Sequence, residues 1–501
     1  MNGVKKLASG FVLSAAVALG ATSAYATLVS TDPVTGGRTY RFKPDDADFT
    51  AFKTTWSNNP GAYFHDYDVY EFEESDAPYV FTRNIWIQKH PFLTFRGVKA
   101  DGSDADPAKV VFTYETAGTS SYFQIEPATN TFSNITFAGM ALNPRSPCTV
   151  ITNCVFMGLT DRSAIYGVAA KTDVVAIDCV FTNNAYAQSP VRTHLSFAAT
   201  NCVFSGNANT ENSINGGGAI SGVSNLSCEN CAFTDNRTTG WYGGAILQNG
   251  GTLALDRCSF VGNSETVTYN RNDGCGGGAV AAIGSVSGHI RNCLFASNSC
   301  ATAISKNTRS YGGGAVYVSG NATALTIENC TFSGSSVSVA SAGQDIGGAL
   351  LVAGGTVGVT NCVFHENRTL LSAGGWGSWN TAHLYLPAAC WALAANCLEA
   401  NFTYNDTYYD FTATNTQLHD LRDGVKGNKV GDYDPKFTDA ENGDYTIQKK
   451  SDCRDAGVLL SWMTNGSLDL GGHPRVDGDR PDIGAYEFFF PIPTGLSVHL
   501  Y

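Results

Sequence analysis

The chain has 501 residues, of which 54 are glycine, and charged residues make up only 15% of it. Val, Ile, Thr, Phe and Tyr are abundant and helix-favouring runs are few, so the composition indicates an all-β protein. The formal net charge of −13 argues against nucleic acid and anionic membrane surfaces as partners.

Residues 1–26 are expected to be a cleaved signal peptide. Lys5 and Lys6 are basic, "FVLSAAVAL" is a short apolar run, and "AYA" (24–26) is a small-x-small cleavage site. The apolar run is shorter than the roughly 20 residues that a membrane span needs, and no later stretch reaches that length, so no transmembrane segment is expected. We expect the mature protein to be secreted or held at the cell surface.

Residues 27–80 are expected to be an N-terminal cap, and residues 81–400 a series of coils. The segments "NIWIQKHPFLTFRGVKADGSDADPAKVVFTYE" (84–115) and "FSNITFAGM" (132–140) already follow the rhythm of the later repeats. Ile135 and Phe137 take the places of a cysteine and a phenylalanine that recur afterwards. A solenoid needs a cap because its open end would expose core and unpaired strand edges.

A Cys-x-Phe pair then recurs at intervals of 23 to 37 residues. Two residues apart on a strand share a face, so both side chains are expected to point inward. The recurring cysteines are Cys154, Cys179, Cys202, Cys231, Cys258, Cys293, Cys330, Cys362 and Cys397. Phenylalanine follows two residues later in the first eight: Phe156, Phe181, Phe204, Phe233, Phe260, Phe295, Phe332 and Phe364.

Six of the nine repeats also carry an asparagine after the phenylalanine, and a glycine-rich "GGA" motif recurs five times between successive cysteines. The asparagines are Asn184, Asn207, Asn236, Asn263, Asn298 and Asn367. Asparagine tolerates a left-handed backbone and can bond its neighbours, so a hydrogen-bonded ladder is expected at this corner. The glycines suit a bend that needs positive φ or close backbone approach.

Short strands, tight turns and an inward ladder of like residues predict a right-handed parallel β-helix, forming one elongated solenoid capped at both ends. Stacked cysteines have nearly parallel side chains, so the ladder cysteines are expected to be buried thiols. Cys275 and Cys300 lie in variable loops of adjacent coils and are candidates for a disulfide. No cysteine and histidine spacing indicates a metal site.

Residues 401–490 change style and are expected to close the solenoid, leaving 491–501 as a tail. The motifs "SDCRDAG" and "DIGAYEF" in this segment resemble the closing segment of secreted bacterial β-helix proteins. The repeats "FSGN", "FTDN", "FVGN" and "FASN", with "GGAI", "GGAV" and "GGAL", are similar to those of polymorphic outer-membrane proteins, a family of autotransporter adhesins. This second resemblance covers roughly residues 200–370 and implies an adhesin-like surface protein.

The loops between the asparagine and the GGA motif are the best candidate for a binding surface. If they stack on one side, their aromatic and charged side chains form a groove suited to sugar rings. A simpler interpretation is that Trp241 and Tyr242 cover the glycine corner and that Arg368 is a solvated turn residue. The candidate residues are Arg237, Trp241, Tyr242, Glu265, Arg271, Asp273, Arg309, Tyr311, His365, Glu366, Arg368, Trp376 and Trp379.

Three functions are compatible with this pattern. The first is a non-catalytic adhesin-like or carbohydrate-binding protein whose ligand is a polysaccharide or another host or cell-surface molecule. The second is a polysaccharide lyase or glycoside hydrolase, which would need paired carboxylates, or Ca²⁺ in the case of a lyase. The third is a structural surface component. No catalytic residues and no other cofactor are indicated, and the fold alone does not choose among the three.

Overall fold

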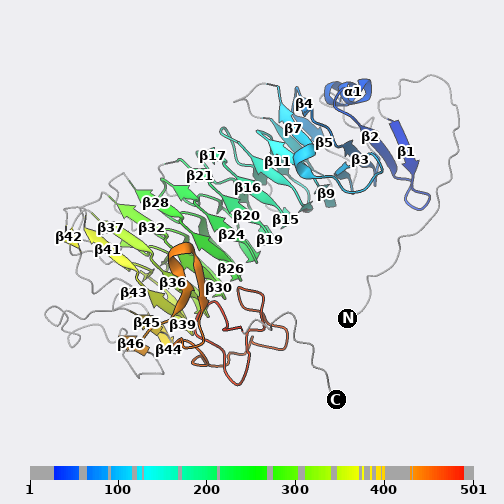
Figure 1. Ribbon diagram of the computed structural model, residues 1–501. Helices are drawn as coiled ribbons and strands as arrows, with labels where there is room; N and C mark the ends of the chain where they lie inside the picture. Colours follow the sequence, from blue (N-terminus) through cyan, green and yellow to red (C-terminus); the bar gives the residue numbers. More distant parts are fainter. Residues whose placement is uncertain are drawn as a thin grey trace, which may run out of the picture.

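The computed structural model describes residues 27–55, 65–87, 92–115, 121–126, 129–167, 172–211, 215–267, 275–302, 311–339, 347–371, 375–376, 384–385, 391–395, 398–400, 429–431 and 433–489. Short strands stack in parallel from one coil to the next in long rows (Figure 1). The chain is therefore a parallel β-helix, as the repeats predict. Its right-handed sense stays a prediction.

The largest sheet of the described residues, sheet A, has 23 strands in two columns. Column 1 contains β5 (Ile85–Ile87), β8 (Tyr122–Ile125), β11 (Ala141–Pro144), β14 (Ile165–Gly167), β18 (Val191–Thr193), β22 (Ile220–Ser221), β34 (Val316–Val318), β38 (Leu350–Val352) and β43 (Leu384–Tyr385). Column 2 contains β2 (Arg38–Phe42), β3 (Val69–Glu73), β6 (Thr94–Val98), β9 (Thr129–Ser133), β12 (Cys148–Thr152), β15 (Asp173–Ile177), β19 (Ser196–Thr200), β23 (Asn225–Glu229), β35 (Ala324–Glu328), β39 (Thr356–Thr360) and β44 (Trp391–Ala395). Two long strands, β26 (Ile246–Asp256) and β30 (Val280–Arg291), run through both columns, and β1 (Thr27–Thr31) pairs with β2.

Two further sheets complete the coils. Sheet B contains the Cys-x-Phe strands: β4 (Tyr79–Phe81), β7 (Val111–Tyr114), β10 (Thr136–Ala138), β13 (Val155–Met157), β16 (Val180–Thr182), β20 (Val203–Ser205), β24 (Ala232–Thr234), β27 (Ser259–Val261), β31 (Leu294–Ala296), β36 (Thr331–Ser333), β40 (Val363–His365), β45 (Leu398–Ala400) and β46 (Lys429–Gly431). Sheet C follows the asparagine corner: β17 (Ala185–Tyr186), β21 (Ala208–Asn209), β25 (Arg237–Thr238), β28 (Ser264–Val267), β32 (Ser299–Thr302), β37 (Ser336–Val339), β41 (Arg368–Leu371) and β42 (Gly375–Trp376). A short pair, β29 (Cys275–Gly276) and β33 (Tyr311–Gly312), lies outside these sheets.

The N-terminal end is closed by α1 (Ala47–Thr55). Phe49 and Phe52 of this helix are fully buried and contact Phe42, Tyr79 and Phe81 at the end of the core. Within residues 27–80, expected as a cap, β2 already pairs in parallel with β3, so coil stacking begins inside that segment. A short 3-10 helix, η2 (Pro107–Lys109), precedes β7.

The expected phenylalanine ladder is present. From Phe137 to Phe364, successive rings lie 4.7–5.0 Å apart with interplanar angles of 3–6°. Eight of the nine ladder cysteines are buried thiols, and Cys397 lies outside the described residues. The repeating Cys-x-Phe motif therefore builds the core.

The asparagine ladder is also present. From Asn184 to Asn298, each side-chain Nδ2 donates to Oδ1 of the next asparagine at 2.9–3.0 Å and to the carbonyl of a core phenylalanine. The expectation of a left-handed backbone at these asparagines is wrong. Positive φ occurs at the residue before each, as in Asp235 (54°), and before each described ladder cysteine, as in Asn230 (52°). The ladder asparagine itself is needed for its side-chain hydrogen bonds.

The glycine corner behaves as predicted. Gly243 has φ of 69°, and a Cβ on Gly244 would lie 1.9 Å from the carbonyl oxygen of Gly278 in the next coil. Any side chain at Gly244 would therefore collide with backbone, so this tight packing requires glycine.

Candidate functional site

Trp241 and Tyr242, two aromatic residues expected to line the predicted groove, are buried. Trp241 and Tyr242 are 3% and 6% exposed and pack with Leu247, Cys275 and Tyr317 in a cluster outside the main core. The residues that cover column 1 of sheet A in these coils are thus part of a second hydrophobic layer. Such burial favours the simpler interpretation, in which Trp241 and Tyr242 cover the glycine corner.

Glu265 is buried with this second layer. It lies on β28 beside Thr238 and Cys300, and its buried carboxyl group interacts with the Cys300 thiol but, among the described residues, has no nitrogen or oxygen hydrogen-bond partner. Burial raises the pKa of Glu265 to about 8, so the carboxyl group is protonated at neutral pH. Cys275 and Cys300 are both buried and both are thiols, so the structure contains no bond between them.

Among the candidates that the structure describes, Arg237 lies apart from His365, Glu366 and Arg368. Arg237 and Arg368 are exposed, but four strand steps of sheet C separate them, a distance of about 19 Å at ~4.8 Å per step. Arg271, Asp273, Arg309 and Trp379 lie outside the described residues, as do the side chains of Tyr311 on β33 and Trp376 on β42. His365 and Glu366 lie at the end of β40.

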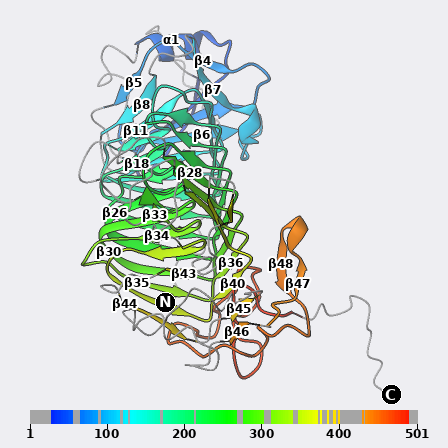
Figure 2. The same cartoon turned by 90° about the vertical axis from the view of Figure 1, so that its left-hand side faces the viewer.

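The closing segment covers the outer face of sheet B. Tyr445 and Phe437 pack with Leu294 and Ala296, and Ile447, Cys453 and Ile483 pack with Val363. Figure 2 shows this segment beside β36, β40 and β46, with its hairpin of β47 (Phe437–Asp439) and β48 (Asp444–Ile447) standing against the coils. The hairpin is joined by η6 (Ala440–Asn442).

The acidic residues of the "DIGAYE" motif hold this segment in shape. Fully buried Arg475 donates to Glu487 and to the carbonyl oxygens of Asp482 and Gly484. Asp482 in turn accepts from the backbone N–H groups of Asp455 and Phe488. Because these carboxylates accept hydrogen bonds from within the closing segment, their role there is structural.

Asparagines that directly precede three of the ladder cysteines form hydrogen bonds with the closing segment. Asn329 donates to the carbonyl of Asp482, and Asn361 both donates to the carbonyl of Val458 and accepts from its N–H. Arg475 also donates to Oδ1 of Asn292. Three successive coils thus present the same side chain to the docked segment.

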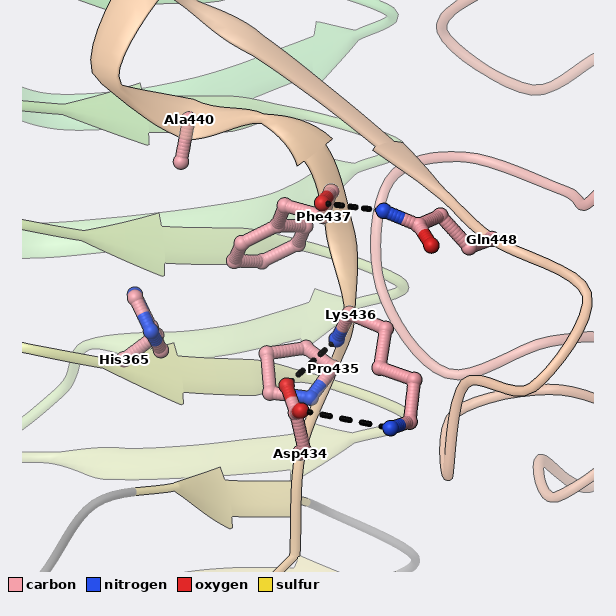
Figure 3. Close-up of a pocket in the computed structure, with 7 residues that line it drawn as sticks. All are labelled: His365, Asp434, Pro435, Lys436, Phe437, Ala440 and Gln448. Carbon is pink, nitrogen blue, oxygen red and sulfur yellow. Dashed lines mark hydrogen bonds and ion pairs between the residues drawn. The ribbon is translucent and has the colours of Figure 1, made fainter.

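A pocket of about 360 Å³ lies where the hairpin meets the coils. His365 comes from β40, and Asp434, Pro435, Lys436, Phe437, Ala440 and Gln448 come from the closing segment (Figure 3). Ligand pockets commonly occupy roughly 300–1,000 Å³ and combine an apolar wall with a few fixed polar groups. This pocket has that size, and its lining is mostly polar.

The polar groups of the pocket are held in place. His365 Nδ1 is 3.0 Å from Ser333 Oγ, and the imidazole meets the Phe437 ring edge-on, with centroids 5.2 Å apart. Burial lowers the pKa of His365, although the carboxylates of Glu366 and Asp434 oppose this shift, so the imidazole is neutral at pH 7. A neutral imidazole offers one donor and one acceptor.

The closing segment supplies an ion pair and an amide to the same pocket. Asp434 accepts from the backbone N–H of Lys436 at 2.7 Å and lies 3.5 Å from its ammonium group. Gln448 Nε2 donates to the carbonyl of Phe437 at 3.0 Å, which orients its amide (Figure 3). The pocket therefore presents donors and acceptors around one aromatic ring, an arrangement suited to hydroxyl-rich ligands.

The comparisons add no assignment: no protein-family model matches this sequence, and no curated protein is found to be similar to it. Within the described residues, no group of three or more His, Cys, Asp or Glu side chains could hold a metal ion. No helix in the described part of the chain is long and apolar enough to cross a membrane.

Of the pocket residues, sequence reasoning identified only His365. Asp434, Lys436, Phe437 and Gln448 lie in "DYDPKFTDAENGDYTIQ", which was assigned to closing the solenoid. The alternation of polar and aromatic residues in that stretch indicates a hairpin. It does not indicate the coil against which the hairpin folds.

Proposed function

We propose that this is a secreted or cell-surface β-helix protein of adhesin-like type that binds carbohydrate without cleaving it. The observation that carries the proposal is the pocket between β40 and the closing hairpin. It places Phe437, a neutral His365, the Asp434–Lys436 pair and the Gln448 amide around one hollow. Sugar rings are bound by such a combination of an aromatic surface and planar or charged polar groups.

The arrangement of charge in the pocket supports binding rather than acid–base chemistry. Asp434 already accepts from Lys436 through both backbone and side chain. Both interactions are made within the closing segment, so the Asp434 carboxylate is already engaged there. The adhesin-like repeats and the export signal expected at the N-terminus agree with a role outside the cell.

The test is a binding screen of the protein on plant, algal and host polysaccharides, with release of new reducing ends measured in the same wells. Lys436→Ala should weaken binding of the retained glycan about tenfold, since a charge-assisted hydrogen bond is lost. Lys450→Ala is the matched control because Lys450 is an exposed lysine of the same segment outside the pocket.

Three outcomes would contradict the proposal. Cleavage of any polymer would make the protein a lyase or hydrolase. Retention of no glycan, or equal binding by both lysine variants, would remove the pocket as a carbohydrate site. A thermal melt of each variant shows that it is folded.

A further inference from the structure

A second surface with ligand-binding chemistry lies on the outer face of sheet A, far from the pocket of Figure 3. Along column 1, the outward side chains of successive coils form one row. Strand register places Trp86 beside Gln124, Gln124 beside Asn143, Tyr166 beside Arg192, and Arg192 beside Ser221. Because β11 and β14 pair at Leu142 and Ile165, Asn143 and Tyr166 are also neighbours.

Trp86 is fixed at the start of this row by a shared carboxylate. Its Nε1 donates to Glu126 Oε1 at 2.8 Å, and Gln124 Nε2 donates to the same oxygen at 2.9 Å. The guanidinium of Arg145 is 3.8 Å from that oxygen. The hydrogen bond at Nε1 orients the indole ring. The side chain is nevertheless 45% exposed, so a large apolar ring faces solvent.

The next members of the row form a chain of polar contacts. Asn143 Nδ2 donates to Gln124 Oε1 at 3.0 Å, which links the second and third coils of the row. The Oδ1 of Asn143 is buried and accepts no hydrogen bond from the described residues. An unused buried acceptor costs free energy unless a donor completes it.

The same row changes character where the protein covers it. Beyond Ser221 it continues as Leu247, Ala281, Tyr317 and Leu351, each paired with the next in register. These four are buried with Trp241, Tyr242 and Cys275. Where the chain supplies its own cover, the row is mostly apolar. Toward the N-terminus the row carries the exposed Trp86, the partly exposed Tyr166 and Arg192, and the buried amides of Gln124 and Asn143.

Spacing along the row suits a linear polymer. Neighbouring strands lie about 4.8 Å apart, so Trp86 and Tyr166 are separated by about 14 Å along the helix. Two outward aromatic rings at that separation, with the Glu126 carboxylate and the Arg192 guanidinium beside them, match stacking of sugar rings and hydrogen bonding of their hydroxyls. The chemistry of the row is therefore that of a glycan-binding track.

We propose that the outer face of column 1, from Trp86 to Arg192, binds a linear neutral oligosaccharide lying along the helix axis. The oligosaccharide stacks on Trp86 and Tyr166, and its hydroxyls bond Glu126 and Arg192. The inference does not depend on the pocket at His365, because the two surfaces belong to different sheets and different coils.

The test is titration calorimetry of the full protein with cello-oligosaccharides and xylo-oligosaccharides from the disaccharide to the hexasaccharide. Affinity should rise with chain length until the ligand spans Trp86 to Tyr166. Trp86→Ala and Tyr166→Ala should each weaken hexasaccharide binding roughly tenfold. Trp86→Phe, which keeps a ring but removes the Nε1 donor, should lose less.

The controls separate this surface from the pocket. Phe489→Ala removes an aromatic ring that is 42% exposed on the closing segment and should leave hexasaccharide binding unchanged. Lys436→Ala, in the pocket, should also leave it unchanged. Equal binding by wild type and Trp86→Ala, loss in Lys436→Ala alone, or no binding of either ligand series by the wild type would each overturn the proposal.

Discussion

The early and late coils share one interior and differ in what covers them. Inside, the phenylalanine ladder passes from Phe137 to Phe364 with almost unchanged geometry. Outside, the late coils are covered twice: sheet A by the layer around Trp241, and sheet B by the closing segment. The early coils leave Trp86, Met157 and Val203 exposed on the same two sheets.

This difference separates two kinds of information in one repeat. Inward positions are set by coil-to-coil packing and are the same wherever the coil lies. Outward positions depend on whether another part of the chain covers them. In sheet B, for example, Val203 and Leu294 occupy the same register position, yet they are 37% and 4% exposed.

The largest expected effect is the pH dependence of stability caused by Glu265, which is buried in the second layer of the late coils. Glu265 has a pKa of about 8 in the folded state against 4.5 as its ordinary value. The folded protein therefore holds a proton that the unfolded chain releases, and stability falls as pH rises from about 4.5 to 8. The full difference corresponds to at most about 5 kcal/mol.

Glu265→Gln removes this titration. The free energy of unfolding of the variant minus that of the wild type should therefore rise from about pH 4.5 to 8 and stay constant at higher pH. Urea unfolding at several pH values measures the effect, and Glu441→Gln, an exposed acid, is the control. Parallel pH profiles for Glu265→Gln and wild type would show that the second layer is open to water.

Arg475→Ala should release the cover of sheet B. The substitution leaves the buried Glu487 carboxylate without its guanidinium partner inside the closing segment. Removing one member of a buried ion pair commonly costs about 3–5 kcal/mol. Limited proteolysis should cut the segment 433–489 early while the coils persist.

Arg480→Ala is the matched control for Arg475→Ala because Arg480 is an exposed arginine of the same segment. Unchanged proteolysis in Arg475→Ala would mean that apolar contacts alone hold the segment in place.

The smallest effect is a direct comparison of one register position in two coils. Val363→Thr places a hydroxyl beneath the closing segment and should lower the free energy of unfolding by about 1–3 kcal/mol. Val203→Thr, in the same column of sheet B but exposed, should change it by about 0.5 kcal/mol or less. Chemical denaturation of both variants measures the pair. Equal losses would contradict the distinction between covered and bare coils.

The interior of the fold was predictable because it repeats. Cysteine and phenylalanine two residues apart share a strand face, so their inward direction followed from local geometry alone. The asparagine ladder was predictable for the same reason, although its left-handed residue lies one position earlier, at Asp235 rather than Asn236. The spacing of residues along the sequence predicts which face of a strand a side chain occupies. It does not predict which residue of the corner has a positive φ.

The outer layers were not predictable from the repeats. Trp241 and Tyr242 are residue types that often line sugar-binding surfaces. Here they are buried in the second layer, together with Tyr317 and Leu351 of later coils. The pocket at His365 needs a hairpin that follows a long intervening stretch of chain. Such contacts depend on packing between distant segments, for which the periodic pattern carries no signal.

The way in which the closing segment attaches has a consequence for how this protein changes length in evolution. The segment binds Asn292, Asn329 and Asn361, and the same position carries Asn153, Asn201 and Asn230 in earlier coils. Duplication of one of these three coils therefore leaves an equivalent set of asparagines at the new end, whereas Asp178 and Arg257 hold the same position in two other coils. Natural variants should differ by entire coils while keeping the same terminal module.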